Sequence, residues 1–329
     1  MPLRTRFLRA DAAAIREAAA VIRAGGLVAF PTETVYGLGA DALAAAAVLR
    51  IFEAKERPRG NPLIVHVAGA DALETVAARV PAPARAVGAV FWPGPLTLVL
   101  PRAAAVPLVT TGGLETVAVR VPAHPVAQAL ISAAERPIAA PSANRSGRPS
   151  PTRAEHVRED LDGRIELILD AGPTPVGVES TVLDMTTEPP TLLRPGGVTL
   201  EALQAVLGRV QVLAGDDEEA ARRSPGLRHR HYAPRARVKV IEPGTGEQAA
   251  LPWLETGRAV ALMAQRPVSS GSPRLHVKTM PRSLDAYARE LFGALRDLDA
   301  TGVEVILVEA VPEEGLGRTV MDRLRRAAS

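Results

Sequence analysis

The sequence predicts an α/β protein with a large first domain and a smaller second one. Short apolar segments of strand length alternate with amphipathic segments of helix length along most of the chain. The 329 residues are enough for two ordinary domains, and the 47% of hydrophobic residues can fill their cores. Because only 3% of the residues are aromatic, aliphatic side chains must make up most of those cores.

The first part of the large domain alternates helix and strand. Asp11 is a suitable N-cap for a helix that ends at Gly25-Gly26, since glycine readily adopts the left-handed C-terminal conformation. A strand is expected from Leu27 to Phe30, and it halts at Pro31. Asp41 to Lys55 has the apolar spacing of a second helix. Further strands are expected at 63–67, 96–100, 116–121, 138–140 and 165–170.

The later part of the chain divides at a change in composition. Thr152 and Glu155 have the spacing of a capping box, which predicts a helix that starts there. A strand pair at 182–185 and 191–194 and a helix at 200–207 follow. Asp216 to Arg223 is charged and is expected to be either helical or disordered. Ser224 to Arg237 is rich in Pro, Arg and His, which is typical of an interdomain linker.

The residues after the linker predict a small Rossmann-like α/β unit. Strands are expected at 238–241, 259–263 and 303–308, with helices at 284–298 and 319–328. The expected division is therefore a large first domain at 1–210, a linker at 211–237 and a small domain at 238–329.

Composition excludes several classes of protein. The 39 basic and 36 acidic residues give a net formal charge of +3, which is no nucleic-acid signature by itself. The absence of cysteine excludes disulfide frameworks, cysteine zinc sites and thiol nucleophiles. No apolar run reaches the ~18 residues of a membrane helix, and the N-terminus lacks the apolar core of a signal peptide. We therefore expect a cytoplasmic protein without membrane contact.

The common catalytic and nucleotide-binding motifs are missing. The sequence has no Walker A loop, no G-x-G-x-x-G after a strand, no H-E-x-x-H and no G-x-S-x-G. Instead, polar clusters follow predicted strands. The first is P-T-E-T-V-Y-G-L-G-A-D from Pro31 to Asp41, where glycines could let the backbone approach a ligand closely. A plain strand-to-helix turn, with Thr34 and Asp41 as caps, explains these residues equally well.

The second cluster is a basic loop from Lys55 to Leu63. Three cations lie within five positions that Pro and Gly interrupt, which predicts a loop that offers positive charge to a polyphosphate. Lys55 is the only lysine before Lys239, and a compact ammonium could be required there. The lone lysine could also be due to chance, and the basic loop could simply be solvated. His66, on the strand that follows, could be an ordinary core histidine.

Two further clusters contain small polar residues and glycine. Ala140 to Thr152 follows a strand and precedes a helix, which suits an anion or ribose site. Val176 to Val182 and Arg194-Pro195-Gly196 form the fourth cluster. Such residues also make ordinary loops, so each cluster alone is weak evidence.

A series of motifs in fixed order is more specific. It runs P-T-E-T-V-Y-G-L-G, K-x-R-P-x-x-N-P-L, P-G-P-L-T, V-A-V-R, A-P-S-A-N-x-S-G, E-S-T-V and L-R-P-G within about the first 210 residues. Together these motifs resemble the YrdC-like family, in particular its two-domain threonylcarbamoyl-AMP synthases. The linker resembles the S-P-G-M-x-x-x-H-Y-A-P element of that branch, with Leu227 in place of Met. A second departure is Asp322, where the family usually has Asn.

The resemblance implies a fold, a reaction and a set of partners. The fold is an open, twisted mixed sheet with flanking helices, followed by the smaller α/β domain. The reaction joins L-threonine, bicarbonate and ATP into threonylcarbamoyl-AMP, with release of pyrophosphate, and Mg²⁺ accompanies the ATP with few or no protein ligands. A downstream tRNA threonylcarbamoyl transferase would use the product for threonylcarbamoyladenosine in tRNA.

The resemblance also implies roles for residues. The threonine-binding residues would be Thr34, His66, Arg120, Ser142 and Ser180. The ATP-binding residues would be Lys55, Arg57, Asn61, Thr116, Asn144, Thr152, Arg194, His231 and Tyr232. Lys55 and Arg57 would act on the phosphates and are the expected catalytic residues, while His231 and Tyr232 would close over the nucleotide as a lid.

Two other functions are compatible with parts of the sequence. A carbamoyl-adenylate-forming hydrogenase-maturation enzyme shares the YrdC-like domain, but such enzymes carry cysteine zinc fingers, and this chain has 0 Cys. A double-stranded RNA-binding module with weak RNA binding is the second alternative. The near-neutral charge and sparse aromatic residues argue against it as the main function.

Overall fold

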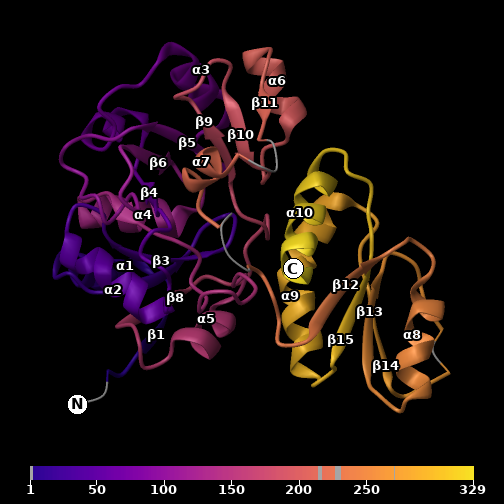
Figure 1. The fold of residues 1–329 in the computed structure, drawn as a ribbon. Helices are drawn as coiled ribbons and strands as arrows, with labels where there is room; N and C mark the ends of the chain where they lie inside the picture. The colour runs from indigo at the N-terminus through magenta and orange to yellow at the C-terminus, as the bar shows by residue number, and fades with distance from the viewer. Residues whose placement is uncertain (1–2, 214–216, 227–230, 270) are drawn as a thin grey trace. The chain divides into compact units, whose positions relative to one another are not determined.

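The computed structural model describes residues 3–213, 217–226, 231–269 and 271–329. They form two compact units, which Figure 1 shows coloured along the chain. The first unit comprises Met1–Ser146, Pro151–Pro175 and Glu179–Arg228, and the second comprises Gly147–Ser150, Val176–Val178 and His229–Ser329. Two short segments before residue 180 therefore belong to the second unit. The boundaries expected at residues 210 and 238 stay predictions.

The first unit is built on one mixed sheet of eleven strands, in the order β1-β8-β2-β3-β7-β4-β6-β5-β9-β10-β11. Parallel pairs such as β4 with β6 and β5 with β9 alternate with antiparallel pairs such as β5 with β6. The strands are β1 (Arg6–Arg9), β2 (Val28–Pro31), β3 (Tyr36–Asp41), β4 (Ile64–His66), β5 (Leu96–Pro101), β6 (Thr116–Arg120), β7 (Ile138–Ala139), β8 (Leu167–Asp170), β9 (Thr181–Asp184), β10 (Thr191–Arg194) and β11 (Gln211–Val212). The predicted mixed sheet is confirmed.

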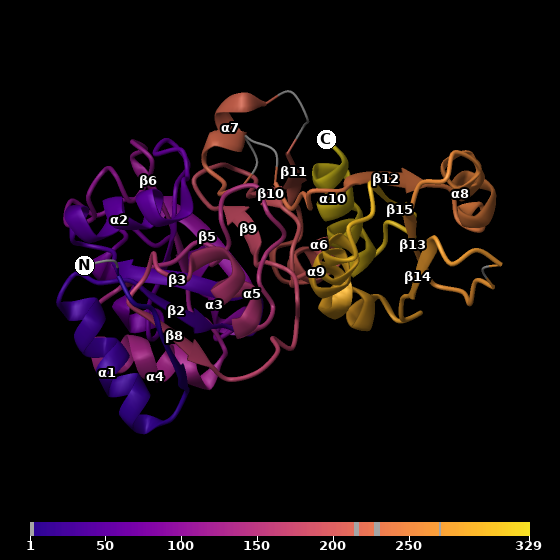
Figure 2. The ribbon, with the colours of Figure 1, turned by 90° about the horizontal axis from the view of Figure 1, so that it is seen from below.

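Helices cover both faces of this sheet. They are α1 (Ala12–Arg23), α2 (Ala45–Lys55), α3 (Ala82–Phe91), α4 (Pro125–Ala134), α5 (Ala154–Leu161), α6 (Leu200–Leu207), α7 (Glu218–Arg222) and a 3₁₀ turn, η1 (Ala70–Thr75). Along β2, Val28 and Phe30 pack with α1 and α4, whereas Ala29 points to the core shared with α2, α3 and α5. This alternation is what a strand buried on both faces requires. Figure 2 shows α1 and α4 side by side.

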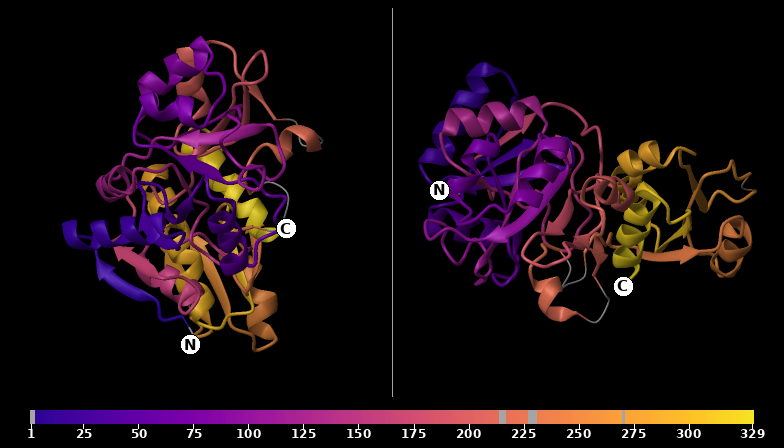
Figure 3. Two further views of the ribbon diagram at one scale, coloured as in Figure 1. Left: turned by 90° about the vertical axis from the view of Figure 1, so that its left-hand side faces the viewer. Right: turned by 90° about the horizontal axis from the view of Figure 1, so that it is seen from above.

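The second unit is a four-stranded parallel sheet in the order β12-β15-β13-β14, with helices on both faces. Its elements are β12 (Arg237–Ile241), α8 (Gly246–Glu255), β13 (Val260–Ala264), β14 (Leu275–Thr279), α9 (Leu284–Ala300), β15 (Val305–Glu309) and α10 (Leu316–Ala328). Figure 3 shows α8 on the opposite side of the sheet from α9 and α10. The predicted Rossmann-like α/β unit is confirmed. None of the helices in the described ranges has both the length and the apolar character needed to span a bilayer.

Several helices and strands lie where the sequence predicted them. Asp11 is the N-cap of α1, and its side chain accepts a hydrogen bond from the Ala14 N–H at 2.8 Å. The strand pair at the fourth cluster exists as antiparallel β9 and β10. The helices expected at 200–207 and 284–298 are α6 and α9.

The helix expected from Asp41 to Lys55 was wrong over its first turn. Tyr36–Asp41 is β3, and α2 begins only at Ala45. A Cβ at Gly39 would lie 2.7 Å from Phe30 Cε1 and 2.8 Å from an Ile138 methyl. This glycine therefore allows the neighbouring side chains of Phe30 and Ile138 to pack closely against the strand.

The capping box at Thr152 was also wrong. The N-cap of α5 is Arg153, and no side chain caps the helix. Thr152 lies one residue too early, and its N–H donates instead to His156 Nδ1 at 3.3 Å. Several elements had no prediction: β1, β3, η1, α3, α4, β11, α8 and β14. Both α3 and α4 have proline in their first turn, and that proline made them look like loops in the sequence.

Candidate active site

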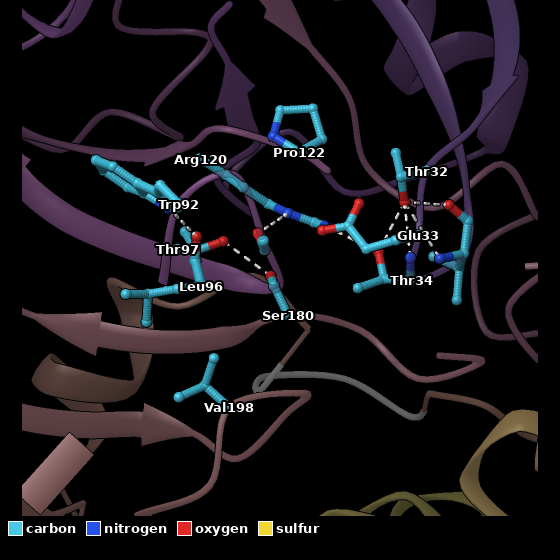
Figure 4. Close-up of polar contacts among 12 residues, drawn as sticks. Thr32, Glu33, Thr34, Trp92, Leu96, Thr97, Arg120, Pro122, Ser180 and Val198 are labelled. Atoms are coloured by element: carbon cyan, nitrogen blue, oxygen red, sulfur yellow. Dashed lines mark hydrogen bonds and ion pairs between the residues drawn. The ribbon is translucent and has the colours of Figure 1, made fainter. Parts of the chain in front are cut away.

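A tight turn between β2 and β3 presents Glu33 and Thr34 to the interior of the first unit. Thr32 Oγ1 donates to the Val35 carbonyl at 2.7 Å and accepts the N–H groups of Thr34 and Val35 at 3.2 and 3.3 Å. These local bonds hold the turn together with the pairing of Pro31 and Tyr36 on either side of it. Glu33 and Thr34 are both buried. Figure 4 shows their side chains beside the guanidinium of Arg120.

Arg120 ends β6 and is the centre of the cluster. It is only 3% exposed, and its Nη1 donates to Thr34 Oγ1 at 2.9 Å. Its Nε donates to the Gly94 carbonyl, within the P-G-P-L-T motif, at 3.2 Å. Nη2 lies 2.6 Å from Glu33 Oε1 in a buried ion pair. The guanidinium is therefore fixed from three sides.

His66 is the neighbour of Arg120 on the adjacent parallel strand β4. Burial lowers the pKa of its imidazole to about 3, and the positive charge of Arg120 adds to this effect. The ring is therefore neutral at physiological pH. It stands edge-on to Phe30, with ring centroids 6.4 Å apart.

Ser180 joins the cluster from the residue before β9. Its Oγ lies 2.8 Å from Thr97 Oγ1 in a hydroxyl pair (Figure 4). Thr97 is the register partner of Arg120 across β5 and β6. Four of the five predicted threonine-binding residues, Thr34, His66, Arg120 and Ser180, thus come together around β4, β6 and β9.

The basic loop and the Ser/Asn loop also meet. The Lys55 ammonium is 1% exposed and donates to the main-chain carbonyls of Ser142 and Asn144. Ser142 Oγ donates to Asn144 Oδ1 at 2.5 Å, which closes the loop on itself. Ser142, the fifth threonine candidate, therefore lies beside the ATP candidates Lys55 and Asn144.

Other ATP candidates are held by main-chain groups. Arg57 is 7% exposed and donates to the Pro62 carbonyl at 3.1 Å, so a solvated basic loop is a wrong description of Lys55 and Arg57. Asn61 Oδ1 accepts the Gly226 N–H at 3.4 Å. Neither contact was visible as a pattern in the sequence.

Arg194 links the last two motifs. Its Nη2 donates to the Ser180 carbonyl at 2.9 Å, and its Nη1 donates to the Pro225 carbonyl at 3.0 Å. A Cβ at Gly196 would lie 2.2 Å from the Thr181 nitrogen, so only glycine fits there. The L-R-P-G segment therefore packs directly against E-S-T-V.

Thr116 lies outside the cluster around Arg120, and two further predicted residues belong to the second unit. Thr116 begins β6, about 13 Å from Arg120 at the usual rise of a strand. His231 and Tyr232 belong to the second unit, where the Tyr232 ring stacks on Phe292 at 5.3 Å. Their role as a lid stays a prediction, and residues 227–230 of the predicted lid lie outside the described residues. Thr152, by contrast, is buried in the first unit.

Glu33 and Gly94 contact Arg120 but were not predicted. Gly94 contributes only a carbonyl, which leaves no side-chain signal. Glu33 had a signal: an acidic residue between two threonines, directly after an apolar strand. Such a charge is rarely buried unless it has a partner.

The sequence and the structure are both similar to those of known proteins along nearly the whole chain. Residues 20–196 match the family model described as "Telomere recombination", and residues 198–329 match "Threonylcarbamoyl-AMP synthase, C-terminal domain". The threonylcarbamoyl-AMP synthase of Pyrococcus abyssi is 52% identical over 324 residues, which cover 95% of this chain and 94% of that protein. The Bacillus subtilis enzyme of the same name is 46% identical over 320 residues, with 95% and 92% covered. The crystal structure of P. abyssi Sua5 complexed with L-threonine matches with a TM-score of 0.92 at 50% identity, covering 100% of this chain and 98% of that one.

Proposed function

Because this chain belongs to the threonylcarbamoyl-AMP synthase family, we propose that it makes threonylcarbamoyl-AMP from L-threonine, bicarbonate and ATP. The neutral amine of threonine adds to the carbon of bicarbonate, and water leaves with the broken C–O bond to give a carbamate. One carbamate oxygen then attacks the α-phosphorus of ATP, and pyrophosphate leaves with the electron pair of the broken P–O bond. The protein is in this sense a nucleotidyltransferase.

The buried cluster around Arg120 is the observation that carries the proposal. Its guanidinium is held by Thr34 and Gly94 and suits the recognition of a carboxylate by charge-assisted hydrogen bonds. The neutral His66 and the hydroxyl of Ser180 add polar groups to a water-poor site, which matters because a carbamate and an adenylate both hydrolyse. The chain's contribution is mainly orientation and charge stabilisation.

The nucleotide is assigned to the residues around Lys55. Lys55, Arg57 and Arg194 are buried cations, and cations that are fixed before substrate arrives stabilise developing phosphate charge most effectively. Asn61 and Asn144 lie in the same loops and provide amide groups. We assign the phosphates to Lys55 and Arg57.

Magnesium is proposed to arrive with ATP. Across the described ranges, no group of three or more acidic or histidine side chains is placed to hold a metal ion. The phosphates can carry the ion, since Mg²⁺ keeps several waters and needs few protein ligands. When bound there, it neutralises phosphate charge.

The product is proposed to pass to a tRNA threonylcarbamoyl transferase, which places the reaction in the cytoplasm together with tRNA and ATP. Direct RNA binding is the second candidate, and filter binding over a salt series would detect it. A main function in RNA binding would give tight, strongly salt-dependent binding without pyrophosphate release.

Pyrophosphate release is the direct test. The protein is incubated with ATP, bicarbonate and each of the twenty amino acids in turn. Threonine should support release and valine should not, because a site that pairs the hydroxyl rejects the isostere without it by several kcal/mol. Arg120→Gln should abolish release, whereas Arg85→Gln, at an exposed arginine of α3, should not. Equal release with valine and threonine would refute the proposed specificity.

A further inference from the structure

Glu33 is a buried carboxylate whose hydrogen-bonding capacity is unused. It is 6% exposed, and neither of its oxygens accepts a hydrogen bond within the described part of the chain. Its one close charged contact there is Nη2 of Arg120 at 2.6 Å, and Nη2 lies close without hydrogen-bond alignment. A buried carboxylate offers about four acceptor positions, and leaving them empty is costly. The carboxylate of Glu33 can therefore accept hydrogen bonds from a bound ligand.

Arg120 alone does not fill the roughly four acceptor positions of Glu33, because Nη2, with its two N–H groups, is the nitrogen that lies beside the carboxylate. Its Nε is used by the Gly94 carbonyl and its Nη1 by Thr34 Oγ1. The main chain that carries Glu33 is held in place, because the hydroxyl of Thr32 bonds to the N–H groups of Thr34 and Val35 and to the Val35 carbonyl. Figure 4 shows the carboxylate beside the guanidinium, next to Thr34. The two opposite charges thus stand fixed side by side, and the acidic one is short of donors.

A free amino acid has the complementary pattern of charge. It carries a carboxylate and, two bonds away, an ammonium with three N–H donors. We infer that Glu33 accepts the α-ammonium of the amino acid substrate, so that Glu33 and Arg120 together form a receptor for its zwitterion. This inference rests on the proposed function, because it concerns the same substrate. The carbamate that forms later keeps one N–H, which the same carboxylate can accept.

A simpler role would be that Glu33 only positions Arg120. The two roles differ in what they predict for a ligand without an amine. If Glu33 merely holds Arg120, its loss weakens every ligand that Arg120 binds. If Glu33 binds the ammonium, its loss weakens only ligands that carry one. Two ligands that differ at this single group therefore separate the roles.

Calorimetric titration of the full chain provides the test. The probes are L-threonine and 2,3-dihydroxybutyrate of matching configuration, in which a hydroxyl replaces the amine. Wild-type protein should bind threonine at least tenfold more tightly. In Glu33→Gln, threonine should weaken ten- to hundredfold, the effect of losing one charge-assisted bond, while dihydroxybutyrate changes less than threefold. Glu74→Gln, at an exposed glutamate paired with Arg85, is the matched control and should change neither affinity.

Equal weakening of both ligands in Glu33→Gln would overturn the inference in favour of positioning, and unchanged affinities would overturn it outright. If Glu33→Gln does not fold, the wild-type comparison decides: equal affinity for the two probes refutes ammonium binding, and a tenfold preference for threonine supports it. Wild-type protein that binds no threonine and releases no pyrophosphate with it would refute the proposed function itself. The two failures are therefore distinguishable.

Discussion

Replacing Lys55 by methionine removes an ammonium and keeps a side chain of similar length. Lys55 closes α2 and is 1% exposed, with its Nζ bonded to the carbonyls of Ser142 and Asn144. Two charge-assisted hydrogen bonds contribute about 3–6 kcal/mol together. Methionine also avoids the cost of burying a charge, which is several kcal/mol. The free energy of unfolding should therefore fall, but by less than these roughly 3–6 kcal/mol.

The assay has to report on the first unit alone, because two units need not unfold together. Trp92 lies in the first unit and Trp253 in the second, so a Trp253→Phe background leaves one reporter. Urea unfolding is then followed by the fluorescence of Trp92. Lys278→Met, at a partly exposed lysine in β14, serves as the control and should shift unfolding of this unit by less than about 0.5 kcal/mol.

The same variant tests the link between this loop and the nucleotide. Lys55→Met should weaken ATP binding and pyrophosphate release at least tenfold, because Ser142 and Asn144 lose their anchor and the phosphates lose a cation. A free energy of unfolding equal to that of the wild type would show that the two carbonyl contacts do not stabilise the fold. Lower stability with intact ATP affinity would show that Lys55 and its loop do not serve the nucleotide.

Two further changes test other parts of the cluster. Gly196→Ala should lower the free energy of unfolding by about 2–3 kcal/mol and remove most of the activity, because the new Cβ would lie 2.2 Å from main-chain atoms. Gly271 lies in open space, so Gly271→Ala is the control and should leave the melting temperature unchanged. Equal melting temperatures for the two variants would contradict this packing. The pKa of His66 is about 3 in the folded protein and about 6.5 in the unfolded chain. Below pH 6.5 the unfolded chain therefore binds a proton that the folded protein does not. The free energy of unfolding should fall as a result by about 2 kcal/mol between pH 6.5 and 4.5. Urea titrations of His66→Gln should lack this component, and identical pH slopes in both proteins would refute it.

Sequence signals succeeded where the physical cause is local. Asp11 caps α1 because the bond runs to an amide three residues on, and the spacing fixes it. Thr152 has the same kind of signal but fails, because the chain enters α5 one residue later. β3 was hidden because the glycines in Y-G-L-G-A-D read as a turn. Their real partners, Phe30 and Ile138, are defined only once β2, β3 and β7 are paired.

The site shows the same limit more clearly. Arg120 could be named from the V-A-V-R motif, but Glu33 lies 87 residues earlier in the chain. The register of β6 against β4 and β5 brings His66, Thr97 and Arg120 to one level. The turn held by Thr32 then places the carboxylate of Glu33 beside Arg120. A sequence pattern can mark such residues, but it cannot show which of two neighbouring polar side chains turns inward.

Charge balance explains why a neutral histidine suits this cluster. Among its side chains Glu33, His66, Arg120 and Ser180, the formal charges are one negative and one positive, because burial beside Arg120 keeps the pKa of His66 low. A protonated imidazole would add a second cation and disturb this balance. A zwitterion brings one charge of each sign, so it meets both fixed charges and leaves the net charge of the buried site unchanged. Burying a ligand with net charge would require a further counter-charge, which is expensive in a site of low polarity. The cluster therefore favours amino acids with neutral side chains before any contact with the side chain is made.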